Sequence, residues 1–305
     1  MKVIDPLFKI YSKSRFFRSF TNFLLNAGRY VIPEATVLKF RFKKMLGYSL
    51  NLDLPKTYNE KIQWLKLNDR SELHVTCADK FAVREHIEKK IGLNYLIPLI
   101  NQTKKVEEIN PETLPDYPVI IKTTHDSGGV LIVRDKHKID WTDARKKLTS
   151  LLNYKYANIK SEWQYEKIEP RLVVEKLLIS EDGKIPSDYK FHCFNGKVGF
   201  IQVDVDRETN HKKNLYDIDW NLIPCEFNYP IGPPVARPTT LGEMIEVAQI
   251  LSKDFLFVRV DLYSVKNKVY FGELTFHPAS GFGKFIPEVW DLNFGQMLKL
   301  PVRSK

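Results

Sequence analysis

Two neighbouring stretches near the C-terminal end, RVDLY and GELTFHP, carry the residue types best suited to metal and phosphate chemistry. Alternate residues of a strand share a face, so we expect Arg259 and Asp261 to point together, and likewise Glu273 and Thr275. A short connection joins the two stretches, and Asp261 and Glu273 can therefore converge. Two carboxylates completed by phosphate oxygens are a usual way for a protein to hold Mg²⁺.

An arginine beside such carboxylates suits a transferring phosphoryl group or developing negative charge. The alternative is a cross-strand charge pair on a solvated face. Because two carboxylates, Asp261 and Glu273, face the single cation of Arg259, the pattern favours the metal and phosphate interpretation.

A second candidate is the stretch IKTTHDSGG, in which Lys122 at a strand end precedes Ser127, Gly128 and Gly129. Adjacent glycines let a loop bring its backbone N–H groups against an anion, and the lysine can place a positive charge on the same phosphate. In isolation, Ser-Gly-Gly is also a common hairpin turn.

A third candidate is the stretch VVEKLL, a buried strand that ends at Glu175 and Lys176. Such a strand end can offer backbone and carboxylate acceptors to an adenine amino group or a ribose. A solvated strand end is the alternative.

The surrounding pattern predicts a mixed fold. Strands are expected at residues 118–124, 130–133, 171–178, 189–194, 197–205, 257–263 and 269–276, and helices at 57–68, 79–90, 141–152 and 241–251. The first of these helices opens with a capping box, in which Thr57 caps free amides and Glu60 reaches back to the cap. Strand–turn–strand units with few helices indicate an α+β fold rather than a regular βαβ alternation.

Composition narrows the class of protein. The 305 residues include 43% hydrophobic and 28% charged residues, which describes an ordinary globular chain. Three scattered cysteines argue against a disulfide framework or a zinc site, so a cytoplasmic protein is expected. The sequence shows neither a signal-peptide core nor a run of ~18 apolar residues that could span a membrane.

The formal charge of +10 is concentrated in the N-terminal fifth, where lysines and arginines alternate with aromatic residues. No sequence-specific nucleic-acid motif accompanies this charge. Residues 5–50 are expected to form two or three short helices. These helices either pack as a lid on the main body or lie on an anionic membrane surface, so a peripheral position at the cytoplasmic membrane face is one expectation.

Several longer motifs give the pattern a family resemblance. Arg-x-Asp followed by Glu on the next strand is similar to the metal site of ATP-grasp ligases such as D-alanine–D-alanine ligase. The chain resembles more closely the TupA-like branch of ATP-grasp proteins, named for teichuronopeptide synthesis, over roughly residues 50–300. The matching stretches are KTYNEKIQWLK (56–66), ADKFAVR (78–84), DYKFHCFNG (188–196), YDIDW (216–220) and GELTF (272–276).

The resemblance implies cofactors, ATP and Mg²⁺, and a role for each matching residue. Lys80 and Lys122 would contact the ATP phosphates beneath a mobile lid of Ser127, Gly128 and Gly129. Adenine and ribose would lie near Glu175 and Leu177, with Lys190 approaching the nucleotide from the next strand. Magnesium would bind Asp261, Glu273 and Thr275, with Arg259 at the transferred phosphate; Arg259 and Lys190 would be the catalytic pair.

One position departs from the superfamily pattern. Thr275 stands where asparagine is usual, and a hydroxyl is a weaker ligand for Mg²⁺ than an amide oxygen. The motif is therefore intact for one metal ion and doubtful for two, unless His277 contributes.

The implied architecture is an ATP-grasp fold, two α+β lobes clasping ATP, with a helical N-terminal extension. We place the extension at residues 1–75, the N-terminal lobe with the glycine-rich lid at 76–178, and the C-terminal lobe with the metal site at 179–305. The implied activity is an ATP-dependent carboxylate–amine ligase of surface-polysaccharide synthesis, joining an amine to a soluble or lipid-linked sugar acid.

Two alternatives remain open at this point. A glycosyltransferase would use an Asp-x-Asp motif, and the sequence offers Asp204-Val-Asp206 and Asp217-Ile-Asp219. A non-catalytic nucleotide-binding module is the other alternative. The mixed acidic and basic segment 204–213 could bind the acceptor or form a plain solvated loop.

Overall fold

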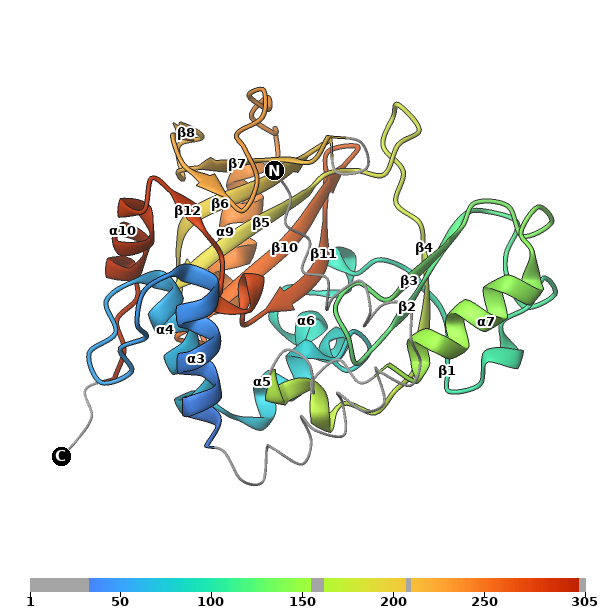
Figure 1. Cartoon of the computed structure of the whole chain (residues 1–305). Helices are drawn as coiled ribbons and strands as arrows, with labels where there is room; N and C mark the ends of the chain where they lie inside the picture. The colour runs from blue at the N-terminus through green and yellow to red at the C-terminus, as the bar shows by residue number, and fades with distance from the viewer. Residues whose placement is uncertain (1–32, 155–161, 207–209, 302–305) are drawn as a thin grey trace.

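The computed structural model describes residues 33–154, 162–206 and 210–301 (Figure 1). Of the helices expected within residues 5–50, the described part contains α3 (Glu34–Leu46), while residues 1–32 lie outside it. In the described ranges no helix is both long and apolar enough to cross a membrane.

The elements follow one another as short helices and mainly antiparallel strands. The other α-helices are α4 (Tyr58–Asn68), α5 (Glu72–Ala78), α6 (Val83–Ile91), α7 (Trp141–Leu152), α9 (Leu241–Ser252) and α10 (Val289–Met297). The 3₁₀ helices are η1 (Leu93–Tyr95), η2 (Val106–Glu108), η3 (Trp163–Lys167) and η4 (Pro278–Gly281).

The strands form a four-stranded, a six-stranded and a two-stranded sheet. The first, in the order β1-β4-β2-β3, contains β1 (Leu99–Thr103), β2 (Val119–Thr123), β3 (Val130–Val133) and β4 (Leu172–Lys176). The second, in the order β11-β10-β5-β6-β7-β8, contains β5 (Asp188–Phe194), β6 (Lys197–Val205), β7 (Lys212–Tyr216), β8 (Leu222–Ile223), β10 (Phe257–Val265) and β11 (Lys268–Thr275). The third pairs β9 (Glu226–Phe227) with β12 (Phe285–Ile286).

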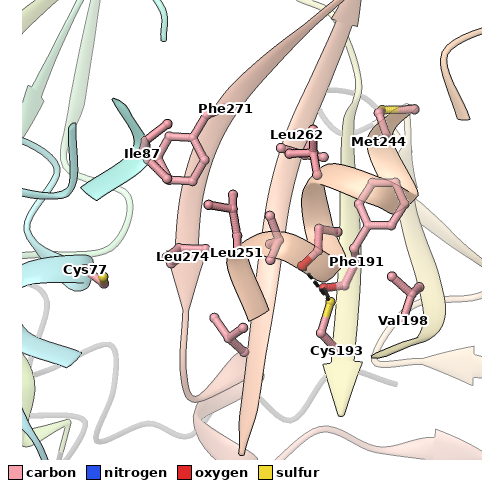
Figure 2. Close-up of a cluster of buried hydrophobic side chains, with 14 of the residues drawn as sticks. Cys77, Ile87, Phe191, Cys193, Val198, Met244, Leu251, Leu262, Phe271 and Leu274 are labelled. Atoms are coloured by element: carbon pink, nitrogen blue, oxygen red, sulfur yellow. Dashed lines mark hydrogen bonds between the residues drawn. The ribbon is translucent and has the colours of Figure 1, made fainter. Parts of the chain in front are cut away.

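Strand alternation sends successive side chains of the six-stranded sheet to opposite faces. One face is apolar, and the other is divided between a polar part and a second apolar core, in which Phe194, Phe200 and Phe257 pack with α4 and α10. Phe191 and Cys193 of β5 and Leu262 of β10 join a core cluster beneath α9, as Figure 2 shows. Their sequence neighbours Lys190, His192 and Asp261 alternate with them and so occupy the opposite face. The sheet therefore holds these polar side chains together on one of its faces.

The four-stranded sheet divides in the same way. Ile121 and Val174 belong to an apolar core shared with α7, on the side of the molecule away from the six-stranded sheet (Figure 1). Lys122 and Glu175, one position along, lie on the other face. That face is the side on which α6 contributes a partner for Glu175.

The predicted capping box at the start of α4 is present. Thr57 Oγ1 accepts a hydrogen bond from Glu60 N at 3.2 Å, and Glu60 Oε2 accepts one from Thr57 N at 3.1 Å. The helix is buried nearly all round, against α10 and the 277–283 loop. Such burial requires that its polar side chains find partners, which they do in the site described below.

The domain boundaries at residues 75 and 178 stay a prediction. The two larger sheets do come from successive parts of the chain, residues 99–176 and 188–275. Residues Cys77, Val83 and Ile87, placed by sequence with the N-terminal lobe, pack into the core of the six-stranded sheet. The linker between α5 and α6, residues 79–82, therefore lies beside the six-stranded sheet, although the sequence places it with the N-terminal lobe.

Candidate active site

The centre of the site is a pair of carboxylates on adjacent strands. Asp261 of β10 is the direct antiparallel partner of Glu273 of β11, and Arg259 is the partner of Thr275 two pairs along, on the same face of the sheet. Side chains opposite each other across two strands have Cβ atoms about 5 Å apart. The structure thus brings together the four residues of the predicted metal and phosphate site.

A single guanidinium group organises this cluster. Arg259 donates from Nε and Nη2 to the two oxygens of Asp261, both at 2.6 Å, which is a bidentate pair. Its Nη2 also donates to Glu273 Oε1 at 3.1 Å and to Thr275 Oγ1 at 3.0 Å. Thr275 Oγ1 in turn donates to Glu273 Oε1 at 3.1 Å. The arginine therefore holds both carboxylates in a fixed orientation.

A glycine makes this register possible. The β10–β11 pairing shifts between Asp261 and Leu262, so that Gly272 is the extra residue on β11. A Cβ atom at Gly272 would lie 2.9 Å from the backbone oxygen of Asp261 and 3.0 Å from the ring of Tyr263. Since real Cβ contacts are not that short, the bulge that aligns Glu273 with Asp261 depends on the missing side chain.

Lys190 brings a second cation to the same face. It is the partner of Asp261 on β5, and its Nζ lies 3.9 Å from Asp261 Oδ2 and 3.2 Å from Asp204 Oδ2. It also pairs with Asp188. Burial by itself would lower the pKa of Lys190, but Asp261 and Asp188 outweigh burial and raise that pKa. Lys190 therefore stays charged in this site.

The two central carboxylates differ in their ease of protonation. Burial raises the pKa of Asp261 to about 7, even though Arg259 and Lys190 act to lower it. Burial also acts to raise the pKa of Glu273, but Arg259, Lys80 and Lys190 together lower it below its usual range. Glu273 is thus the firmly ionised member of the pair, and a metal ion would further favour the ionised form of Asp261.

The predicted glycine-rich loop is closed on itself and tied to the α5–α6 linker. Thr123 Oγ1 donates to Asp126 Oδ1 at 2.6 Å, and Lys80 Nζ donates to the backbone oxygen of Asp126. Ser127 and Gly128 are exposed at the tip, and Gly128 has φ +96°, in the left-handed region that suits glycine. The loop thus presents an exposed tip on a braced base.

Gly129 is the buried member of the loop. A Cβ atom there would meet Asp126 Oδ2 at 2.1 Å and Thr123 Oγ1 at 2.3 Å. Glycine is therefore required at this position for the Thr123–Asp126 closure.

The predicted nucleotide residues of the four-stranded sheet meet one another. Lys122 Nζ of β2 lies 2.8 Å from Glu175 Oε2 of β4. Arg84 of α6, to which the sequence assigned no role, lies 2.9 Å from the other oxygen, Oε1. Leu177 is buried just after β4, where its N–H donates to Pro118 O at 3.0 Å. Burial lowers the pKa of Lys80, while Glu273 acts to raise it and Lys122 to lower it, so Lys80 lies near both this group and the metal residues.

Sequence reasoning also missed a row of polar side chains on α4. Asn59 Nδ2 donates to Gly283 O at 2.7 Å, Gln63 Nε2 to Gly281 O at 2.7 Å, and Lys66 Nζ to Ser280 O at 2.7 Å. The spacing i, i+4, i+7 in the KTYNEKIQWLK motif places them on one helix face, and this spacing was the available signal. They brace the loop that follows the metal strand.

The braced loop carries an unusual backbone. Ala279 and Ser280 have φ of 48° and 54°, and Gly281 has φ of 66°. Non-glycine residues in this region cost of order 1 kcal/mol each and cluster at functional sites. His277, considered above as a metal ligand, is buried, and its Nδ1 lies 3.3 Å from Gln164 Nε2.

Comparison with known proteins bears on this arrangement. A family model described as TupA-like ATPgrasp matches residues 60–299. The chain belongs to the TupA-like ATP-grasp family. This membership confirms the predicted family and, with the mixed antiparallel architecture, the predicted α+β ATP-grasp fold class. No curated protein matches the chain.

Solved ATP-grasp structures resemble the TupA-like chain at low sequence identity. The D-alanine–D-alanine ligase of Bacillus anthracis complexed with ATP is 20% identical, with TM-score 0.38, covering 66% of this chain and 53% of its own length. The D-alanine–D-alanine ligase of Helicobacter pylori is 15% identical, with TM-score 0.42, covering 81% and 68%. The L-amino acid ligase of Bacillus licheniformis is 14% identical, with TM-score 0.44, covering 73% and 49%. The chain thus spans about half to two thirds of their lengths.

Proposed function

We propose that this TupA-like ATP-grasp protein is an ATP- and Mg²⁺-dependent carboxylate–amine ligase. The observation that supports the proposal most directly is the pairing of Asp261 with Glu273 under the shared guanidinium of Arg259. Family membership supplies the expectation of ATP as the co-substrate.

The donor set fits magnesium. Within the described ranges, no cluster of three or more His, Cys, Asp or Glu side chains could enclose a metal ion. A metal ion in the site would thus need ligands from the substrate as well as from the protein. The protein offers two carboxylates, Asp261 and Glu273, with Thr275 Oγ1 as a weaker third donor. Mg²⁺ is commonly held by one or two carboxylates together with substrate phosphates, and when bound it neutralises charge on the phosphoryl oxygens.

The cations fit a polyphosphate. Lys190 and Arg259 pair with Asp261 on the six-stranded sheet, while Lys122 pairs with Glu175 and Lys80 with Asp126 on the side of the glycine-rich loop. Lys80 interacts electrostatically with both Glu273 and Lys122, which places it near both groups of cations. Distributed positive charge of this kind is how phosphoryl transfer is mainly accelerated, because little covalent work is needed from the protein.

The proposed reaction has two balanced steps. An oxygen of the substrate carboxylate attacks the γ-phosphorus of ATP, and the bond from that phosphorus to the β–γ bridging oxygen breaks. ADP is the leaving group, and the substrate becomes an acyl phosphate. The amine nitrogen then attacks the acyl carbon, the C–O bond to phosphate breaks, and the amine loses a proton as the amide and inorganic phosphate form. Arg259 orients the transferred group and stabilises its charge.

The structure gives less support to the glycosyltransferase alternative. The Asp217 carboxylate accepts hydrogen bonds from Asp219 N at 3.0 Å and Asn221 N at 2.8 Å, so it closes a turn. Asp204 is paired with the cations Lys190 and Lys213, and its Oδ1 lies 3.1 Å from His211 Nε2. Neither Asp-x-Asp motif therefore presents a carboxylate pair for a metal and a sugar nucleotide.

The proposal extends to the chemical class of the two substrates. The TupA-like branch favours a sugar acid as the carboxylate and an amino acid or other amine as the acceptor, in surface-polysaccharide synthesis in the cytoplasm. A lipid-linked sugar acid would agree with the exposed face of α3, where Phe40 is 72% exposed beside Lys39, Lys43 and Lys44. Such a basic, aromatic face suits the anionic inner membrane surface.

Hydroxylamine trapping tests the proposal without knowledge of the natural amine. The full chain would be incubated with ATP, Mg²⁺, hydroxylamine and single uronic acids, and hydroxamate and ADP would be measured together. Equal amounts of the two products, lost on removal of Mg²⁺, are expected for the correct acid. Turnover of a sugar nucleotide with no response to ATP would contradict the proposal and favour the glycosyltransferase.

A further inference from the structure

The Glu175 carboxylate is shared between two cations that approach from different elements. Arg84 Nη1 of α6 lies 2.9 Å from Oε1, and Lys122 Nζ of β2 lies 2.8 Å from Oε2. Glu175 is only 7% exposed. Both carboxylate oxygens of Glu175 are therefore paired with cations of the protein itself.

The two cations differ in how firmly they are held. Arg84 also donates from Nη2 to the backbone oxygen of Ile97 at 2.9 Å, just before β1. A planar guanidinium fixed through two nitrogens keeps one orientation, whereas an ammonium group on a flexible stem can exchange partners. Lys122 is therefore the mobile cation and Arg84 the fixed one.

The burial of Glu175 makes this difference important. A buried carboxylate that loses its only counter-ion carries a large electrostatic cost. If Lys122 were the sole partner, its transfer to a phosphate would leave that cost in place and weaken phosphate binding. With Arg84 present, Glu175 keeps one counter-ion after Lys122 moves.

We propose that Arg84 is a positioning residue, the permanent counter-ion of Glu175 that releases Lys122 to the polyphosphate of a bound nucleotide. The inference rests on the proposed function, in that it takes a nucleoside polyphosphate as the ligand. It assigns a physical reason to the arginine that ends the ADKFAVR motif. Arg84 itself need not touch the nucleotide.

Calorimetry of the full chain with ADP and with adenosine, in the presence of Mg²⁺, tests this role. The ratio of the two affinities isolates the contribution of the phosphates. For Arg84→Gln we expect this ratio to fall about tenfold, the size of one lost charge-assisted interaction. Arg84→Lys should keep a ratio between those of wild type and Arg84→Gln, because it restores the charge but not the planar fork.

A double variant separates release of Lys122 from a general packing defect. In Arg84→Gln/Glu175→Gln the neutral amide no longer retains Lys122, so the ratio should recover to within about threefold of wild type. A packing defect would instead leave the double variant as poor as the worse single variant. Arg145→Gln, on the exposed face of α7, is the matched control and should leave the ratio unchanged.

Each failure has its own meaning. An unchanged ratio in Arg84→Gln, or no recovery in the double variant, would overturn the role of Arg84 while leaving the ligase proposal intact. If Arg84→Gln does not fold, Glu175→Gln alone tests the role: without the carboxylate Lys122 is no longer retained, so the ratio should equal or exceed that of wild type, and a fall would overturn the role of Arg84. Absence of ADP binding by the wild-type protein would overturn both proposals.

Discussion

Asp261 lies directly opposite Glu273, and one nitrogen of Arg259 donates to both, at 2.6 Å to Asp261 Oδ2 and at 3.1 Å to Glu273 Oε1. This relationship explains how the buried carboxylate of Asp261 and the partly exposed carboxylate of Glu273 can be held side by side. The same guanidinium that offsets their repulsion also lies where a transferred phosphoryl group would need positive charge. Preorganisation and charge balance therefore depend on one side chain.

The glycine-rich loop gives a direct steric prediction. Gly129→Ala should lower the free energy of unfolding by about 2 kcal/mol, because its Cβ would collide with Asp126 and Thr123. It should also weaken nucleotide binding. Gly242→Ala is the matched control: nothing lies within 4 Å of its Cβ position in α9, so stability should stay equal or rise by up to about 1 kcal/mol. Urea denaturation measures both, and equal effects of the two substitutions would contradict the loop geometry.

The brace from α4 predicts a large cost for a buried lysine. Lys66 is fully buried and donates to Ser280 O at 2.7 Å and Ser280 Oγ at 2.9 Å. Lys66→Met should lower the free energy of unfolding by about 3 kcal/mol, since it leaves these acceptors buried without their charged donor. Hydrogen exchange in the 277–283 loop should accelerate as well.

The control for this brace lies on the surface. Lys44→Met on the exposed side of α3 should change stability by no more than about 0.5 kcal/mol. Retention of full stability and slow exchange in Lys66→Met would show that the strained loop is held by other contacts.

A buried histidine predicts a pH effect with a definite sign. Burial and the nearby cation Arg259 hold the pKa of His192 well below its usual range. The unfolded chain protonates this histidine near pH 6.5 and the folded chain does not, so its contribution to stability is complete above pH 6.5 and is lost as pH falls. Asp261, whose pKa burial raises to about 7, acts in the opposite direction over part of this window.

A comparison of wild type with His192→Phe separates the two effects, because Asp261 is present in both proteins. Between pH 5 and 6.5, wild type should lose up to about 1.4 kcal/mol more stability per pH unit than His192→Phe. His137→Gln, at an exposed site, should follow wild type. Parallel pH profiles for wild type and His192→Phe would contradict the assignment of a neutral buried ring.

Local sequence rules predicted the strands that carry chemistry better than they predicted the helices. The alternation around Asp261 and Glu273 places both on one face, and the structure shows them paired. The helix predicted over 79–90 is wrong at its start: α5 ends at Ala78, Asp79 accepts hydrogen bonds from Phe81 N and Ala82 N, and α6 begins at Val83. Asp79 has extended backbone angles, and its side chain accepts from the amides two and three positions on, as an N-cap residue does, so it precedes the helix and is not part of it.

Long-range neighbours could not be predicted from local sequence patterns. Nothing local indicates that β5 lies beside β10, which is what brings Lys190 to Asp261. The same holds for Arg84, whose partner Glu175 is 91 residues away. Such contacts depend on tertiary packing, for which a single sequence has no periodic signal.

The most direct test of the account is calorimetry of ATP binding with and without Mg²⁺, on wild type and Glu273→Gln. The account predicts Mg²⁺-dependent binding by wild type, at least about tenfold weaker in Glu273→Gln, since a carboxylate ligand is lost. Glu181→Gln, an exposed glutamate, should bind as wild type does. Binding of ATP that ignores both Mg²⁺ and the Glu273 substitution would contradict the proposed metal site and, with it, the ligase mechanism.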